Sequence, residues 1–250
     1  MIAPVLRVGV IGAYGRMGSE VCRAVEAEDD LELVCKAGRE DYLDELENLS
    51  DAAVAVEFST PQSVRENVLQ LLDQGLDVVV GSTGLSPSDL GDIEASAIDH
   101  GGKVLVAPNF AVGAVLMMRF AAAAAPHFDA VEIVERHHEG KFDAPSGTAL
   151  RTAALINEEL ARPTVTLDED RAPASRGLNA GRIRIHSLRL PGSVAHHEVV
   201  LGGRGQTLTI RHDSIDRSSF MPGVLLAIRG VGDLPAPLTV GLEHLLDLGA

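Results

Sequence analysis

The side chains best suited to chemistry in this 250-residue sequence lie in one short stretch, residues 134–149. His137 and His138 are adjacent, and Lys141 follows them closely. Imidazole groups titrate near neutral pH, and a lysine adds a fixed positive charge. The stretch therefore combines proton donors with a cation, as the chemistry of a small acidic molecule requires.

The end of the same stretch predicts a turn followed by a helix. Asp143–Thr148 is rich in turn-forming residues, and apolar residues at helical spacing continue to about Leu160. The first amides of a helix point at whatever precedes them, and the helix dipole favours an anion there. Ordinary capping gives the same pattern, and histidines beside an acidic residue often lie on a solvated face, so the residues alone leave both interpretations open.

A second candidate site lies near the N-terminus, where a glycine-rich turn joins a strand to a helix. Residues 5–11 form a short apolar strand, and Gly12, Gly15 and Gly18 follow it. This context is typical of dinucleotide binding, because backbone amides approach a pyrophosphate closely where no Cβ intervenes. The spacing G-x-x-G-x-x-G is not the common one, and glycines also simply end strands.

The residues after the predicted strand Leu31–Cys35 bear on the choice of coenzyme. An acidic residue about 20 positions beyond the glycines normally binds the adenosine ribose. Gly38 stands there instead, flanked by Lys36 and Arg39. This pattern is compatible with a 2′-phosphate and hence with NADPH, and Arg16 could reach the same phosphate. The charges of a solvated loop explain the pattern equally well.

The order of the predicted elements indicates an α/β fold with two domains. Repeated strand–helix units up to residue 110 predict a parallel, doubly wound, Rossmann-like sheet, whose ligands bind at the carboxyl ends of the strands. Residues 1–110, joined by about 219–250, would form the dinucleotide-binding domain. Residues 111–218 would form an α+β domain for substrate binding and oligomerisation.

That second domain is predicted from a change of pattern after residue 110. A long Ala/Met-rich helix leads to a strand that delivers the histidines, and residues 161–180 look like a loop. Alternating runs at 182–188, 197–201 and 206–212 then indicate an open mixed or antiparallel sheet with one exposed face. Such faces often pair with copies of themselves, so we expect a homo-oligomer.

The composition predicts a globular, cytoplasmic protein with a small-molecule partner. The 21 basic and 36 acidic residues give a net charge of −15, which argues against nucleic-acid binding. No apolar run is long enough to cross a membrane, and the N-terminus lacks the features of a signal peptide. Cys22 and Cys35 fall in predicted core elements, as in a reducing cytosol.

A zinc site is not expected, although histidines recur. His196 and His197 could be grouped with His137 and His138, but adjacent histidines on a strand point to opposite faces. No cysteine joins them, so metal ligation is not predicted.

Taken together, the chain resembles the 4-hydroxy-tetrahydrodipicolinate reductases, also called dihydrodipicolinate reductases, of bacterial lysine and diaminopimelate biosynthesis. The resemblance covers nearly the whole chain, and its most specific part is the H-H-x-x-K-x-D-A-P-S-G-T pattern. The motifs that carry it are, in order, Val10–Gly18, Glu57–Pro61, Gly81–Gly84, Ala107–Gly113 and Glu135–Ala149.

The resemblance implies reduction of a cyclic imine dicarboxylate by NADH or NADPH in a tetrameric enzyme. His137 would be the acid/base residue and Lys141 the second proton donor, while His138, Gly147 and Thr148 would bind the carboxylates of the substrate. The coenzyme would be bound by Gly12, Ala13, Tyr14, Gly15, Arg16, Met17, Gly81, Ser82, Thr83, Ala107, Pro108, Asn109 and Phe110. Tyr14 is bulky where the family often has a smaller residue or lysine, and Gly38 replaces an acidic residue.

Two other classes of function stay open. A different NAD(P)-dependent dehydrogenase would turn over amino or hydroxy acids. A non-catalytic nucleotide sensor on the same fold would bind NAD(P) without hydride transfer. The intact pair of His137 and Lys141 argues against the sensor.

Overall fold

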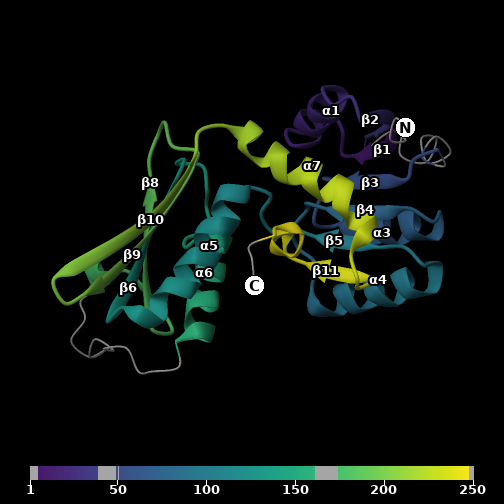
Figure 1. Ribbon diagram of the computed structural model, residues 1–250. Helices are drawn as coiled ribbons and strands as arrows, with labels where there is room; N and C mark the ends of the chain where they lie inside the picture. Colours follow the sequence, from purple (N-terminus) through teal and green to yellow (C-terminus); the bar gives the residue numbers. More distant parts are fainter. Residues whose placement is uncertain (1–4, 39–48, 50, 161–173, 248–250) are drawn as a thin grey trace. The chain divides into compact units, whose positions relative to one another are not determined.

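The computed structural model divides the chain into two compact units, each built around a sheet of its own (Figure 1). Unit 1 comprises residues 1–112 and 220–250, and unit 2 comprises residues 113–219. The structure describes residues 5–38, 49, 51–160 and 174–247.

Unit 1 contains a six-stranded sheet in the order β11-β5-β4-β3-β1-β2. Every neighbouring pair of strands is parallel, which confirms the doubly wound sheet predicted from the repeated strand–helix units. The strands are β1 (Leu6–Ile11), β2 (Leu31–Ala37), β3 (Val54–Glu57), β4 (Asp77–Val80), β5 (Val104–Val106) and β11 (Leu238–Val240).

Helices cover both faces of this sheet. They are α1 (Gly18–Glu26), α3 (Val64–Asp73), α4 (Pro87–His100) and α7 (Met221–Gly230). Helix α1 contacts α7, whereas α3 contacts α4 (Figure 1). Val78 and Val80 of β4 belong to the core cluster beneath α3 and α4. Because strand side chains alternate, Val79 between them is buried on the opposite face.

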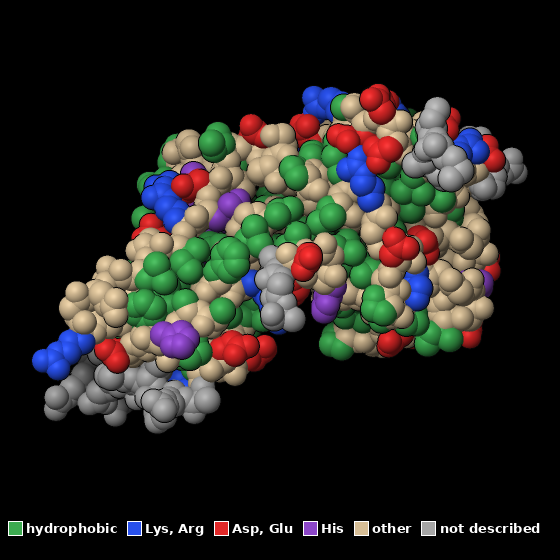
Figure 2. Space-filling view, viewed as in Figure 1, with side chains coloured by type: hydrophobic (Ala, Val, Ile, Leu, Met, Phe, Trp, Pro, Cys, Tyr) green, Lys and Arg blue, Asp and Glu red, His purple; other side chains and the backbone are tan. Residues whose placement is uncertain are grey.

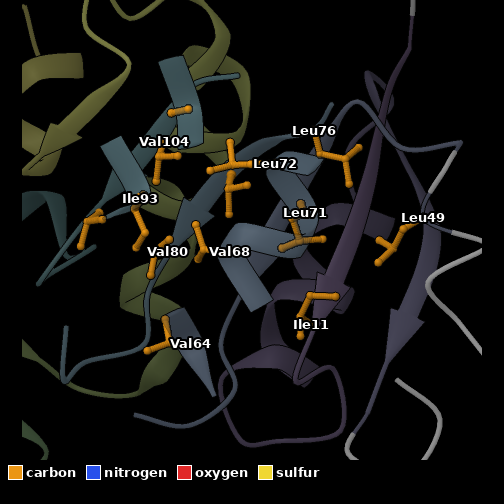
Figure 3. Close-up of a cluster of buried hydrophobic side chains, with 14 of the residues drawn as sticks. Ile11, Leu49, Val64, Val68, Leu71, Leu72, Leu76, Val80, Ile93 and Val104 are labelled. Atoms are coloured by element: carbon orange, nitrogen blue, oxygen red, sulfur yellow. The ribbon is translucent and has the colours of Figure 1, made fainter. Parts of the chain in front are cut away.

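The core beneath α3 and α4 is formed by apolar stripes at helical spacing. Val64, Val68, Leu71 and Leu72 of α3 lie in the cluster with Ile93 of α4 (Figure 3). The sequence predicted these stripes, because each repeats with the period of a helix. They fix the sheet whose carboxyl edge carries the candidate nucleotide site.

The starts of the two helices differ in their capping. Ser86 caps α4 with a capping box to Asp89. Ser63 precedes α3, but its side chain makes no capping bond. The hydroxyls of Ser59 and Ser63 bond each other instead, and Ser59 bonds the buried carboxylate of Glu57, which competes for these groups.

The surface of unit 1 is rich in ion pairs. Figure 2 shows acidic side chains (red) beside basic ones (blue) on this unit. Arg229 of α7, for example, donates to Glu28 and Asp30 at 2.7 and 2.6 Å, and these contacts raise the pKa of its guanidinium. No helix among the described residues is long and apolar enough to cross a membrane.

Unit 2 contains a five-stranded mixed sheet in the order β10-β9-β6-β8-β7. Strands β6 and β8 are parallel, and the other pairs are antiparallel. The strands are β6 (Ala130–His137), β7 (Leu178–Ala180), β8 (Ile183–Arg189), β9 (Ala195–Gly203) and β10 (Gln206–Ser214). This confirms the predicted mixed sheet.

One face of the unit 2 sheet is covered by helices α5 (Val112–Ala124) and α6 (Gly147–Glu159) (Figure 1). Helix α6 packs on β6, β7 and β8. The register aligns Ile133 with Ile185 and Val199, and all three are buried. Because side chains alternate along a strand, Val134 and its neighbours on β8 and β9 lie on the opposite face. Figure 1 shows none of the described helices against that face.

The segment predicted as a loop, residues 161–180, needs a correction at its end. Residues 174–176 form a turn of 3₁₀ helix, and residues 178–180 form strand β7. This strand is too short to show a periodic pattern and is defined by its pairing with β8, where Leu178 lies opposite Ile185. Residues 161–173 lie outside the described residues.

His197 is a buried histidine in this sheet, 5% exposed on β9 and opposite Glu135 of β6. Its Nε2 atom has no hydrogen-bond partner among the described residues. Burial is the main cause that lowers the pKa of His197 to about 4. The charges of His137 and His212 act in the same direction, and Glu135 opposes them. The ring is therefore neutral near pH 7.

Protonation of His197 should make the protein less stable in mild acid. Between pH 6.5, the ordinary histidine value, and pH 4, only the unfolded chain binds this proton. Acidification through this window therefore favours unfolding, by at most about 1.4 kcal/mol per pH unit. Urea unfolding measures this effect on wild type and His197→Gln. As the pH falls from about 7 to about 4.5, the free energy of unfolding of wild type should decrease relative to that of the variant.

The exposed His127→Gln is the control for loss of an imidazole on the surface of the same unit. Parallel pH profiles for wild type and His197→Gln would show that His197 binds no additional proton on unfolding.

Candidate functional site

The glycine-rich turn after β1 is held tightly against the loop after β3. Gly12 has a φ of 75°, and a Cβ atom on it would lie 2.5 Å from the carbonyl oxygen of Phe58. A Cβ on Gly18, the first residue of α1, would lie 2.1 Å from the carbonyl oxygen of Gly12. Both positions therefore require glycine, and the backbone of the turn is brought to the edge of the sheet.

A pocket of about 490 Å³ lies at this edge. Its walls come from the turn after β1 (Gly12, Tyr14, Gly15), from Gly38 after β2, and from the segment after β3. The lining residues of that last segment are Phe58, Ser59, Thr60, Gln62, Ser63 and Asn67. The chain leaves β1 toward β2 and then returns to add β3 on the other side, so the strand order reverses here. Doubly wound sheets bind ligands at such a switch point, which makes the pocket the candidate nucleotide site.

A buried carboxylate supports the floor of this pocket. Glu57, the last residue of β3, is fully buried, and its Oε1 accepts hydrogen bonds from the Ser59 amide at 3.0 Å and the Asn67 amide group at 3.1 Å. Oε2 has no partner among the described residues. Glu57 thus fixes the turn from β3 into α3. This role of Glu57 was not predicted from the sequence, in which Glu57 is only part of the Glu57–Pro61 motif. An acidic residue at the end of a buried strand was the available signal.

The other predicted coenzyme residues follow β4 and β5 at the same edge. A Cβ on Gly81 would lie 2.1 Å from the Phe58 ring, and the rings of Phe58 and Phe110 are 5.7 Å apart. The loops after β3, β4 and β5 therefore meet. Ala107 is buried, Pro108 and Thr83 are exposed, and Ser82 and Asn109 are half-buried.

The remaining residues of the glycine turn differ in exposure. Ala13 is buried, Met17 is the half-buried residue that precedes α1, and Arg16 is exposed. Lys36 lies on β2 with its ammonium group 2.6 Å from a carboxylate oxygen of Glu26. Arg39, the other predicted cation, lies outside the described residues.

The second candidate site lies in unit 2, at the end of β6. Glu135 and His137 are two residues apart on this strand, so their side chains share a face. Nδ1 of His137 lies 2.6 Å from Oε2 of Glu135, which is fully buried. Two nitrogens of Arg189 donate to the two oxygens of the same carboxylate, each at 2.9 Å, and the Ser146 amide donates to it at 3.2 Å.

These contacts decide the charge of Glu135 and the tautomer of His137. Burial alone raises the pKa of Glu135, but hydrogen bonds from His137, Arg189 and Ser187 outweigh it and hold this pKa at about 2. An ionised carboxylate can only accept hydrogen bonds, so Nδ1 of His137 carries a proton. Nε2 is therefore the nitrogen that can exchange a proton with a reactant.

Arg189 also braces the loop that follows β6. Its Nε donates to the carbonyl of Lys141 at 3.1 Å, and Nη2 donates to the carbonyl of Asp143 at 2.5 Å. Neither Arg189 nor the role of Glu135 was predicted from the sequence. Arg189 ends a strand far along the chain, and only its register partner, His137 on the parallel strand β6, reveals the connection.

The predicted substrate-binding residues follow in the same braced segment. The Lys141 ammonium group lies 2.8 Å from Asp143, whose pKa it lowers. His138 is exposed. Ser146 caps α6 by accepting from the Ala149 amide at 3.2 Å, and a Cβ built on the exposed Gly147 meets nothing within 4 Å. Thr148 is half-buried in the first turn of α6.

Unit 2 thus presents an imidazole oriented by a carboxylate, an exposed imidazole, an ammonium group and an open helix start in one segment. The helix dipole and the cations suit a ligand with carboxylates. Among the described residues, no three His, Cys, Asp or Glu side chains come together as they would around a metal ion.

Comparisons with known proteins show the family of this chain. Residues 6–110 match the family model described as dihydrodipicolinate reductase, N-terminus, and residues 113–246 match dihydrodipicolinate reductase, C-terminus. The 4-hydroxy-tetrahydrodipicolinate reductase of Streptomyces coelicolor is 50% identical, over 97% of this chain and 98% of the relative. That of Thermobifida fusca is 49% identical, over 97% of this chain and all of the relative.

Solved structures give the same result. A dihydrodipicolinate reductase from Paenisporosarcina sp. TG-14, with dipicolinate bound, matches with a TM-score of 0.85 and 37% identity, over 97% of this chain and 100% of the other. An amine dehydrogenase from Mycobacterium smegmatis matches with a TM-score of 0.69, over 99% of this chain and 98% of the other, but at 13% identity it shows only a shared fold. The chain belongs to the dihydrodipicolinate reductase family.

Proposed function

We propose that this protein catalyses the NAD(P)H-dependent reduction of 4-hydroxy-tetrahydrodipicolinate to tetrahydrodipicolinate in the cytoplasm, as a step of lysine and diaminopimelate biosynthesis. The observation that carries the proposal is the His137–Glu135–Arg189 arrangement beside Lys141 and the start of α6. Relatives that are about half identical over nearly the full chain bear the name of this reductase.

The substrate is a cyclic dicarboxylate, and unit 2 offers positive partners for its charges. Lys141, now paired with Asp143 near the surface, would exchange that partner for a substrate carboxylate. His138 and the start of α6 at Gly147 and Thr148 would bind carboxylate oxygens. Dipicolinate, the planar dicarboxylate bound to the Paenisporosarcina relative, is a suitable probe for this site.

Proton supply falls to the residues at the end of β6. The 4-hydroxyl of the substrate must first leave as water, together with a ring proton, which leaves a conjugated ring. The reduced nicotinamide, when bound, would supply a hydride to the ring carbon at the end of that conjugation. The ring nitrogen side then gains electron density and needs a proton, which we assign to Nε2 of His137, with Nζ of Lys141 as the second donor. Glu135 holds the imidazole through Nδ1, so that Nε2 keeps one direction.

The nucleotide would occupy the switch-point pocket of unit 1. The glycine turn supports close approach of the pyrophosphate, because Gly12 and Gly18 carry no Cβ. The loops after β4 and β5 lie at the same sheet edge and would contact the nicotinamide side of the coenzyme.

Removal of either proton donor should abolish most turnover. For His137→Ala and Lys141→Ala we expect kcat to fall by about 100-fold or more, because each removes a positioned proton donor. An assay that generates the cyclic imine and follows nicotinamide absorbance measures this, while calorimetry should find NADPH affinity unchanged. The exposed His127→Ala is the matched control.

Unchanged turnover in either variant would refute the role assigned to the residue that was replaced. The same assay with amino and hydroxy acids tests the other dehydrogenase class, and binding of NADPH without oxidation would indicate a nucleotide sensor.

Arg189 should act through the position and charge of Glu135. In Arg189→Gln, loss of the bidentate contact raises the pKa of Glu135 from about 2, so the acidic limb of the kcat profile should move to higher pH. Arg189→Lys should restore part of the shift, and Arg204→Gln in the exposed β9–β10 turn should not change the profile. If kcat fell equally at every pH and the acidic limb did not move, the role of Arg189 would be purely structural.

We also propose that the protein is a homotetramer assembled through the face of the unit 2 sheet that carries Val134 and Glu198. Light scattering should give about 105 kDa, four times the 26.3 kDa of one chain. Val134→Glu should reduce the mass, because it buries a charge in the contact, whereas Ile98→Glu on the exposed surface of α4 should not. If light scattering gave wild type the mass of a single chain, the proposed assembly would be contradicted.

A further inference from the structure

The pocket of unit 1 contains an unusual pair at the place where the adenosine ribose of a coenzyme would bind. Gly38 follows β2, where doubly wound sheets commonly carry an acidic acceptor for the ribose 2′-hydroxyl. The ring of Tyr14 lies over it: a Cβ built on Gly38 would be 2.6 Å from Cδ2 and 2.8 Å from Cε2 of Tyr14. Both residues line the pocket.

Tyr14 is held in this position from outside the pocket. Its hydroxyl donates to the carbonyl of Lys36 on β2 at 3.4 Å, although the side chain is 68% exposed. Contacts below 3.0 Å do not occur for a real Cβ, so no larger residue fits at Gly38 while the ring stays there. The Tyr14 ring in this position and an acidic residue at position 38 therefore exclude one another.

The charges around the pair favour a phosphate over a hydroxyl. None of the described residues that line the pocket is acidic. Glu57 lies beneath the lining, fully buried and bonded to Ser59 and Asn67. Arg16, exposed just after the tyrosine, has no carboxylate within ion-pair distance among the described residues, whereas Lys36 is paired with Glu26 at 2.6 Å.

We infer that Tyr14, by occupying the space above Gly38, sets the coenzyme preference of this protein toward NADPH. The ring takes the place of the acceptor that would bind a free 2′-hydroxyl, and it leaves a neutral wall beside Arg16 that admits a 2′-phosphate. The inference rests on the proposed function only in requiring a nicotinamide dinucleotide in this pocket.

Calorimetric titration with NADPH and with NADH tests the inference without any substrate. Wild type should bind NADPH about fivefold or more tightly than NADH, the effect of one exposed charge contact. Arg16→Gln should remove this difference. Arg23→Gln, in the last turn of α1 and paired with Glu20 at 2.5 Å, should keep it and is the matched control.

The exclusion of Tyr14 and an acid at position 38 is tested by a double-mutant cycle. Gly38→Asp alone should weaken both coenzymes, because the ring must be displaced, and Gly38→Ala should show the same steric loss without a charge. In the Tyr14→Ala background, Gly38→Asp should instead strengthen NADH binding and reverse the preference. Thermal unfolding of each variant checks that the fold is retained, and the high exposure of Tyr14 makes its replacement mild.

Equal affinity of wild type for the two coenzymes, or tighter binding of NADH, would overturn the inference. So would a gain of NADH affinity in Gly38→Asp with Tyr14 still present. These results would leave the reductase assignment intact, since turnover is measured separately. Failure to bind either coenzyme would instead contradict both the inference and the proposed function.

Discussion

The ionised carboxylate of Glu135 is the interaction on which the candidate active site depends. A buried carboxylate is costly unless donors surround it, and here an imidazole, a guanidinium and a backbone amide do so. Each donor belongs to a different part of the site: the end of β6, the end of β8 and the start of α6. One charge therefore sets the ring of His137, the loop around Lys141 and the position of the helix that follows.

Unit 1 is organised by a similar principle around Glu57. This carboxylate is also fully buried, on the last residue of β3, and its partners Ser59 and Asn67 come from the turn and helix that follow. In both units, a buried acid within two residues of the end of a strand fixes the loop that would hold a ligand. Backbone position is thereby set at the two places where the proposed chemistry needs it.

The sequence predicted those features whose cause is local. The apolar stripe of Val64, Val68 and Leu71 indicates α3, because its helical period is visible within one segment. His137 and Lys141 were found by residue type and by a specific motif. Strand β7 was missed because pairing with β8, rather than its own three residues, makes it a strand.

The partners of Glu135 were missed for a related reason. Arg189 meets the carboxylate only because β8 runs parallel to β6 in a register that no single segment encodes. The same applies to the capping of α3, where a buried acid diverts hydroxyls that otherwise suit a helix start. Contacts of this kind become visible only when distant segments are placed together.

The C-terminal strand β11 has a consequence for how the chain is made. It completes the sheet of unit 1 beside β5, yet all of unit 2 lies between the two in the sequence. During synthesis, the ribosome releases every residue of unit 2 before this last strand of unit 1. Unit 2 can thus finish folding first, while the sheet of unit 1 keeps the edge at β5 unpaired until β11 has been synthesised.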